Sequence, residues 1–165
     1  MESLLRPRIG VMGPSLCSSH VYGLAREVGF LIGREGAILI CGGGSGVMEA
    51  AARGAKEAGG ITIGILPGGN AAEANAYIDI PIVTDLGNAR NVINVLTSQA
   101  IIAVHGAYGT LSEIALAMKC RTPVVGLHTW KLVPPVGEEL PPIALAQSAE
   151  EAVATAMRLA RTARQ

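Results

Sequence analysis

Residues 37–58 read Ala37-Ile-Leu-Ile-Cys41, then Gly42-Gly-Gly-Ser-Gly46, then Val47-Met-Glu-Ala-Ala-Ala-Arg-Gly-Ala-Lys-Glu-Ala58. The first five residues are apolar and have the length of a buried strand, and the next five form a glycine-rich loop. The remainder has helical spacing until two glycines end it. This stretch therefore predicts a strand, a loop and a helix, which is the repeating unit of an α/β protein.

The same unit recurs on both sides of this stretch. Further strands are predicted at residues 8–13, 61–66, 80–83, 100–104 and 123–127, and further helices at 21–32, 85–98, 110–119 and from 148 onward. Parallel strands need crossover connections and are buried on both faces, so this alternation predicts a Rossmann-like parallel sheet with helices on both faces. We expect a single domain over residues 1–165, with its ligand at the edge where the loops that follow strands converge.

Composition limits the classes of partner. Lys and Arg together number 13, as do Asp and Glu, and only 3% of residues are aromatic, which argues against a nucleic-acid partner. The apolar runs are too short to span a membrane. Three cysteines without a CxxC pair and without a signal segment favour a cytoplasmic location, with Cys41 and Cys120 expected in the core. The three histidines lack metal-ligand spacing, so no metal site is expected.

The glycine-rich loop is the first candidate phosphate site. Gly43, Gly44, Ser45 and Gly46 allow close approach of the backbone to an anion at the start of a helix. The loop lacks the third glycine of the dinucleotide fingerprint. The alternative is that its glycines only form a tight strand-to-helix turn.

Gly13 and Ser15, in the loop after the first strand, are also predicted to contact the ligand. The alternative for the serines of this loop, Ser15 and Ser18, is that they cap the helix that follows.

A second candidate phosphate loop carries Gly106, Tyr108, Gly109 and Thr110 and leads to Glu113. Two such loops at one edge favour a phosphorylated ligand. The alternative is a capping box, in which Thr110 caps the helix and Glu113 reaches back to the cap.

Arg90 is predicted in the first turn of a helix, where the helix dipole disfavours a cation by roughly 0.3–1 kcal/mol. A bound anion would reverse that sign, so Arg90 is a candidate anion-binding residue. The alternative is a surface salt bridge with Asp85.

Four ordered motifs, Cys41–Glu49, Gly64–Gly68, Ala89–Asn91 and Gly106–Glu113, resemble the LONELY GUY and molybdenum-cofactor-carrier superfamily, whose members are often labelled possible lysine decarboxylases. Resemblance to its phosphoribohydrolases, which release a free base from a nucleoside 5′-monophosphate, implies that Glu113 is the active-site carboxylate and Arg90 the catalytic arginine. A carboxylate suits this reaction because cleavage of an N-glycosidic bond builds oxocarbenium character. The resemblance also assigns Gly109 and Thr110 to the phosphate.

The sequence departs from those enzymes in two places. His105-Gly106-Ala107 replaces Pro-Gly-Gly, and Asn91 stands where the enzymes have lysine. With these differences, its compact length and its Gly64–Gly68 segment, the sequence resembles the carrier branch more closely, whose members bind a phosphorylated pterin without a necessary turnover step. We therefore expect a binding or carrier protein for a phosphorylated nucleotide or pterin, with the molybdenum cofactor as carried ligand and no required cofactor.

The first alternative to a carrier is a nucleoside-monophosphate phosphoribohydrolase, and the second is a scaffold whose pocket no longer binds a ligand. A pyridoxal-dependent lysine decarboxylase is excluded because it needs a lysine in the site, whereas Lys56 and Lys119 fall near helix ends away from that edge.

The predicted helices at 85–98 and 110–119 are apolar around most of their circumference, which favours a homodimer. In that arrangement a neighbouring subunit would complete each pocket.

Overall fold

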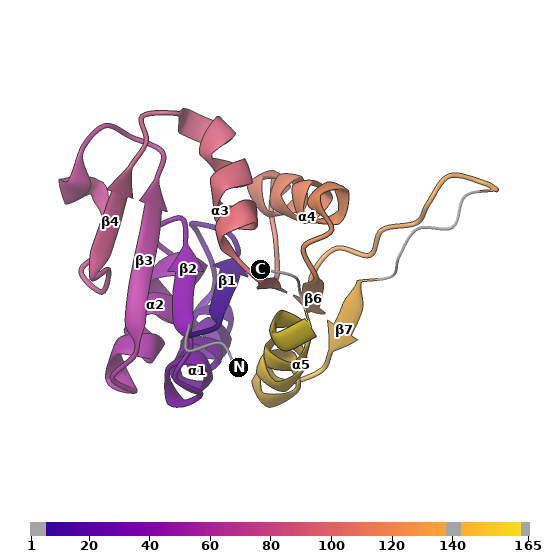
Figure 1. The fold of residues 1–165 in the computed structure, drawn as a ribbon, viewed down its shortest axis with the longest axis horizontal. Helices are drawn as coiled ribbons and strands as arrows, with labels where there is room; N and C mark the ends of the chain where they lie inside the picture. Colours follow the sequence, from indigo (N-terminus) through magenta and orange to yellow (C-terminus); the bar gives the residue numbers. More distant parts are fainter. Residues whose placement is uncertain (1–5, 138–142, 163–165) are drawn as a thin grey trace.

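The computed structural model describes residues 6–137 and 143–162. Within them the chain forms a seven-stranded parallel sheet in the order β4-β3-β2-β1-β5-β6-β7 (Figure 1). The strands are β1 (Arg8–Met12), β2 (Ile38–Cys41), β3 (Ile61–Leu66), β4 (Ile80–Val83), β5 (Ala100–Val104), β6 (Val124–Leu127) and β7 (Ala144–Ala146). Strand β5, beside the central strand β1, is buried along its whole length, as expected for a sheet covered on both faces.

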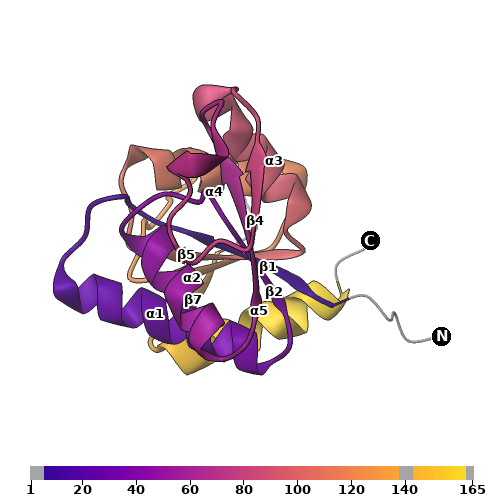
Figure 2. The same cartoon turned by 90° about the vertical axis from the view of Figure 1, so that its left-hand side faces the viewer.

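Helices cover both faces of the sheet, as Figure 2 shows in an end-on view. One face is packed by α1 (Ser19–Arg34), α2 (Val47–Glu57) and α5 (Ala149–Thr162), and the other by α3 (Asn91–Thr97) and α4 (Tyr108–Cys120). Two short 3-10 helices, η1 (Ala71–Glu73) and η2 (Gly87–Arg90), lie in the loops around β4. The predicted Rossmann-like α/β fold is confirmed.

Helices α1 and α2 approach each other through glycines. A Cβ at Gly29 would lie 1.9 Å from the carbonyl oxygen of Ala51, and a Cβ at Gly54 would lie 1.8 Å from that of Arg26. No real Cβ atom tolerates such a separation, so the absence of a side chain at both positions lets the two backbones come together.

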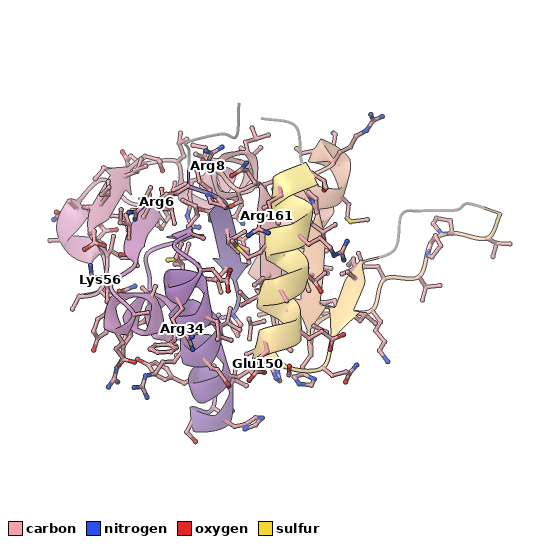
Figure 3. The ribbon with its side chains drawn as sticks, turned by 60° about the horizontal axis from the view of Figure 1, so that its bottom comes forward. Arg6, Arg8, Arg34, Lys56, Glu150 and Arg161 are labelled. Atoms are coloured by element: carbon pink, nitrogen blue, oxygen red, sulfur yellow. The ribbon has the colours of Figure 1, made fainter. Side chains whose placement is uncertain are left out.

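Helix α5 has charges that complement its dipole. Glu150 lies in the first turn and Arg161 in the last, at opposite ends of the helix (Figure 3). An acidic group near the amino end and a basic group near the carboxyl end both stabilise a helix.

Three local predictions are wrong. The helix expected at 85–98 is instead η2 followed by α3, because Asp85 and Gly87 both have left-handed backbone, with φ of 54° and 53°, which prevents a continuous helix. Cys120 is exposed, because it is the last residue of α4 and the chain turns away at Arg121. The strand β7 was not predicted, since its three residues are too few to show a period.

No helix in the described ranges is long and apolar enough to span a membrane.

Candidate functional site

The topology places the candidate loops together. All strands are parallel, so the loops that follow β1, β2, β3 and β5 lie at one edge, and β1 lies between β2 and β5, where the connections change direction. In open α/β sheets this position is the usual ligand site.

The glycine loop after β2 is tied to the loop after β1. Ser45 Oγ donates to the carbonyl oxygen of Ser15 at 2.9 Å, and the Val47 amide donates to the carbonyl of Pro14 at 3.0 Å. Gly46 has a φ of 64°, and a Cβ there would lie 2.5 Å from the carbonyl oxygens of both Pro14 and Ser15. Ser45 therefore joins two loops, and Gly46 is required by a close backbone approach.

Asn75, in the loop after β3, holds the other side of the glycine loop. Its side-chain Nδ2 donates to the carbonyl oxygens of Gly44 at 2.8 Å and Gly43 at 3.2 Å. Its backbone N–H also donates to the Gly43 carbonyl oxygen, at 2.9 Å. The Gly43 amide donates in turn to Cys41 Sγ at 3.4 Å. The sequence carried no signal for Asn75, because an amide side chain in a long loop has no pattern.

Two smaller predictions concern the loop after β1. Gly13 packs closely against α2, since a Cβ there would lie 2.4 Å from Val47 Cγ1. The cap of α1 is Ser18, whose Oγ accepts from the Val21 amide at 3.3 Å. The capping alternative thus holds for Ser18, while Ser15 contributes its carbonyl oxygen to Ser45 and stays a predicted ligand contact.

Arg90 lies at the end of η2 and points inward, with its side chain only 12% exposed. A Cβ at Gly42 would lie 2.5 and 2.7 Å from its Nη atoms, so the guanidinium rests against the glycine loop. Its Nη1 lies 3.9 Å from Glu113 Oε1, and its buried Nε has no hydrogen-bond partner among the described residues. The predicted alternative, a salt bridge with Asp85, is wrong because the carboxylate beside Arg90 is that of Glu113.

Glu113 projects from α4 toward Arg90 and is buried. Asn94 Nδ2, from α3, donates to its Oε1 at 3.0 Å. Burial raises the pKa of Glu113, against the opposing effects of the Asn94 hydrogen bond and the Arg90 charge. For Arg90, burial lowers the pKa, and the negative charge of Glu113 is the largest effect that opposes this shift. The pair is thus desolvated, and each charge is only partly compensated.

The capping-box alternative for this helix is wrong. Helix α4 begins at Tyr108 with Ala107 as its cap, and no side chain caps it. Thr110 is the third helical residue and is buried, while Glu113 faces Asn94 and Arg90. The helix starts two residues earlier than the pattern indicated, and the hydrogen-bond partner of Glu113 is Asn94 of α3 instead of the helix cap.

The start of α4 carries the aromatic residues of the site. Tyr108 is 82% exposed, and its ring centroid lies 6.2 Å from that of Trp130. A Cβ at Gly106 would lie 2.8 Å from Trp130 Nε1, a buried donor without a partner in the described part of the chain. Gly109 has open space around its Cα. These residues leave one rim of the site both aromatic and open.

His105 directly follows β5 and has a left-handed backbone, with φ of 51°. Its ring centroid lies 6.0 Å from that of His128, which follows the neighbouring strand β6 and has a φ of 52°. Burial, and then the charges of His128 and His20, lower the pKa of His105.

Among the described residues, no three acidic, histidine or cysteine side chains gather as a metal site.

Known proteins give matches over nearly the whole chain. A family model described as the SLOG cluster4 family matches residues 6–160. The molybdenum cofactor binding protein of Rippkaea orientalis is 42% identical, with a TM-score of 0.86, covering 95% of this chain and 99% of that one. The molybdenum cofactor carrier protein of Chlamydomonas reinhardtii is 41% identical, with a TM-score of 0.80, covering 94% and 98%.

A protein of Archaeoglobus fulgidus is 48% identical over 129 residues, which are 78% of this chain and 82% of that protein.

The Rippkaea and Chlamydomonas structures confirm the predicted resemblance to molybdenum-cofactor carriers at the level of sequence and fold. The extent of the family match shows that this chain belongs to the SLOG cluster4 family.

Proposed function

We propose that this protein binds a phosphorylated pterin or nucleotide-like molecule at the carboxyl edge of its sheet, and that its physiological ligand is the molybdenum cofactor, carried without chemical change. The observation that carries the proposal is the buried guanidinium of Arg90, which lies against the glycine loop and whose Nε has no partner in the described part of the chain. Two structures at 41–42% identity with this chain are of proteins that bind or carry that cofactor, which supports the choice of ligand.

The electrostatics of Arg90 favour an anion. A desolvated guanidinium is costly unless it is paired and hydrogen-bonded, and its partner Glu113 lies at 3.9 Å, beyond the 2.7–2.9 Å of a strong charge-assisted bond. A phosphate oxygen on Arg90 would supply the missing acceptors. The predicted contacts to Gly44, Ser45 and Gly46 then belong to the same phosphate.

The residues of the second loop fit the flat ring system of a pterin. Trp130 and Tyr108 offer aromatic surface beside Gly106, and the buried Trp130 Nε1 is a donor that has no acceptor among the residues the structure describes. Aromatic side chains pair with planar rings by stacking or edge contacts. In this arrangement Gly106, Gly109 and Thr110 line the path between ring and phosphate.

The test uses the molybdenum cofactor released under nitrogen from a molybdenum enzyme. The protein is mixed with it and passed through a desalting column, and retained molybdenum and pterin are measured by mass spectrometry. Arg90→Ala should lose most of the retained cofactor. The matched control is Arg34→Ala, because Arg34 is an exposed arginine at the carboxyl end of α1 (Figure 3). Equal retention by both variants would exclude Arg90 as the anion site.

A homodimer is part of this proposal. Leu96 of α3 is 65% exposed and Leu86, just before η2, is 51% exposed, which leaves apolar surface on the α3–α4 face. We expect a second copy to cover it. Sedimentation should give a dimer for the native chain and a monomer for Leu96→Glu, and a native monomer at micromolar concentration would remove the dimer.

The second candidate function is hydrolysis of a nucleoside 5′-monophosphate. It is favoured by one observation, a buried Glu113 whose pKa is raised by burial beside an arginine. Against it, Asn91, which stands where the enzymes have lysine, donates its Nδ2 to Ser112 Oγ at 3.0 Å and so joins α3 to α4. Incubation with AMP separates the two functions, because free adenine that disappears in Glu113→Gln would establish the hydrolase.

A further inference from the structure

We propose that Asn94 is a positioning residue that holds the Glu113 carboxyl group apart from Arg90 and so keeps the guanidinium open to an anionic group. The inference rests on the proposed function, since it concerns the anion site described above. Asn94 is absent from every motif of the sequence analysis, and it lies on α3, fully buried between the sheet and α4.

The distances show which partner holds the carboxyl group. Glu113 Oε1 lies 3.0 Å from Asn94 Nδ2 and 3.9 Å from Arg90 Nη1. The side chains of Glu113 and Arg90 are only 9% and 12% exposed, so water does little to separate the two charges. Opposite charges in such surroundings attract strongly, and a contact near 2.8 Å would be expected without a competing donor. Asn94 is that donor.

The separation has a consequence for binding. An arginine and a carboxylate in direct contact often form two parallel hydrogen bonds, which would consume the donors that an anion needs. Within residues 6–137 and 143–162 the Nε of Arg90 has no hydrogen-bond partner, although it is buried. Holding Glu113 on Asn94 therefore preserves donors that a tight ion pair would remove.

The second polar atom of Asn94 serves the bound state. Its Oδ1 is buried and has no hydrogen-bond partner within the described residues. A phosphate on Arg90 would place negative charge beside Glu113 and favour its protonated form. The carboxylic acid then needs an acceptor for its O–H, and Asn94 Oδ1 is available. Anion binding is thus coupled to uptake of one proton from solvent by Glu113, and one amide satisfies both protonation states.

The test is a double-mutant cycle with inorganic phosphate as the probe. Affinity is measured at pH 8 by NMR titration of the native protein, Asn94→Leu, Glu113→Gln and the double variant. We expect Asn94→Leu to weaken phosphate binding by about tenfold or more, the equivalent of one charge-assisted contact. In the Glu113→Gln background the same change should have no effect within about twofold, because no carboxylate remains to pair with Arg90. Equal losses in both backgrounds would mean that Asn94 acts only through packing, and would overturn the inference.

A second readout needs no ligand. The pKa of Glu113 is followed by carbon-13 NMR of the carboxyl group in the native protein and in Asn94→Leu. We expect the pKa to fall in the variant, because the released carboxylate moves onto Arg90, whereas a rise would mean that Asn94 merely stabilised the carboxylate and would refute the proposal. Asn94→Ser, which leaves space instead of filling it, replaces the leucine variant if that chain does not fold. A native protein that binds no phosphate but shows the expected fall would remove the proposed function and leave the role of Asn94 in place.

Discussion

Gly42→Ala should separate ligand binding from stability. A Cβ at position 42 would lie 2.5 and 2.7 Å from the Nη atoms of Arg90 and 2.8 Å from Met48 Sδ. These atoms are the far ends of flexible side chains, and Gly42 does not have left-handed backbone, so the chain itself can stay in place. To restore an ordinary contact near 3.5 Å, the guanidinium must move by about 1 Å. Displacing a positioned charged group by this distance costs about 10- to 100-fold in affinity, or about 1.4–2.8 kcal/mol.

The assay uses Trp130, the single tryptophan of the chain, as a fluorescent reporter beside the site. Titration with the released molybdenum cofactor gives Kd, and thermal unfolding gives Tm. We expect Gly42→Ala to raise Kd by about 10- to 100-fold with a Tm within about 4 °C of the native value. Gly23→Ala is the control, because a Cβ at this helical glycine meets nothing within 4 Å. A native Kd in Gly42→Ala would show that the contact of Arg90 with the glycine loop has no part in binding, and would refute the reasoning.

The remaining predictions concern stability and reactivity. Gly54→Ala should lower the free energy of unfolding by at least about 2 kcal/mol, because its Cβ would lie 1.8 Å from a backbone oxygen of α1. Denaturant unfolding measures this change, and an unchanged midpoint would contradict the packing of α1 on α2. Burial raises the pKa of the Cys41 thiol to about 11, so Cys41 should resist iodoacetamide at pH 8 while the exposed Cys120 is alkylated. Peptide mass spectrometry would show the labelled positions, and early labelling of Cys41 would be inconsistent with its burial. Asp79→Asn should destabilise the protein by about 1 kcal/mol at pH 7. Burial tends to raise the pKa of Asp79, but hydrogen bonds from Lys56 and Thr62 outweigh it and the pKa is lowered. The lost stability therefore belongs to the ionised form: it is fully present above the ordinary carboxyl pKa of 3.8 and declines as the pH falls from there through the lowered pKa, so a deficit that does not shrink between pH 7 and pH 3 would count against these bonds.

Periodicity was enough to predict the fold. Short apolar runs separated by helical segments require parallel strands with crossovers, and this rule also predicts that the glycine loop after β2 and the loop that leads to Glu113 meet at one edge of the sheet. The same rule could not find β7, which has three residues and follows a proline-rich stretch.

The partners of the site residues were beyond the reach of pattern. The spacing of Thr110 and Glu113 matches a capping box, but that motif describes a helix on its own, and here α3 supplies Asn94 as a stronger partner for the carboxyl group. Asn75 likewise acts through contacts 31 and 32 residues away in the chain. Amide side chains have no periodic signature, so their roles emerge only when the packing of distant segments is known.

The bonds among Ser45, Ser15 and Asn75 bear on the speed of exchange. These hydrogen bonds lie within the chain itself, so on the proposed function the loops need no reordering when a ligand binds. Among variants of one binding site, association rates vary over only about one to three decades, while affinities vary over many more. The residence time of a ligand is then set by its dissociation rate. That rate depends on the few side chains that contact the ligand, more than the association rate does.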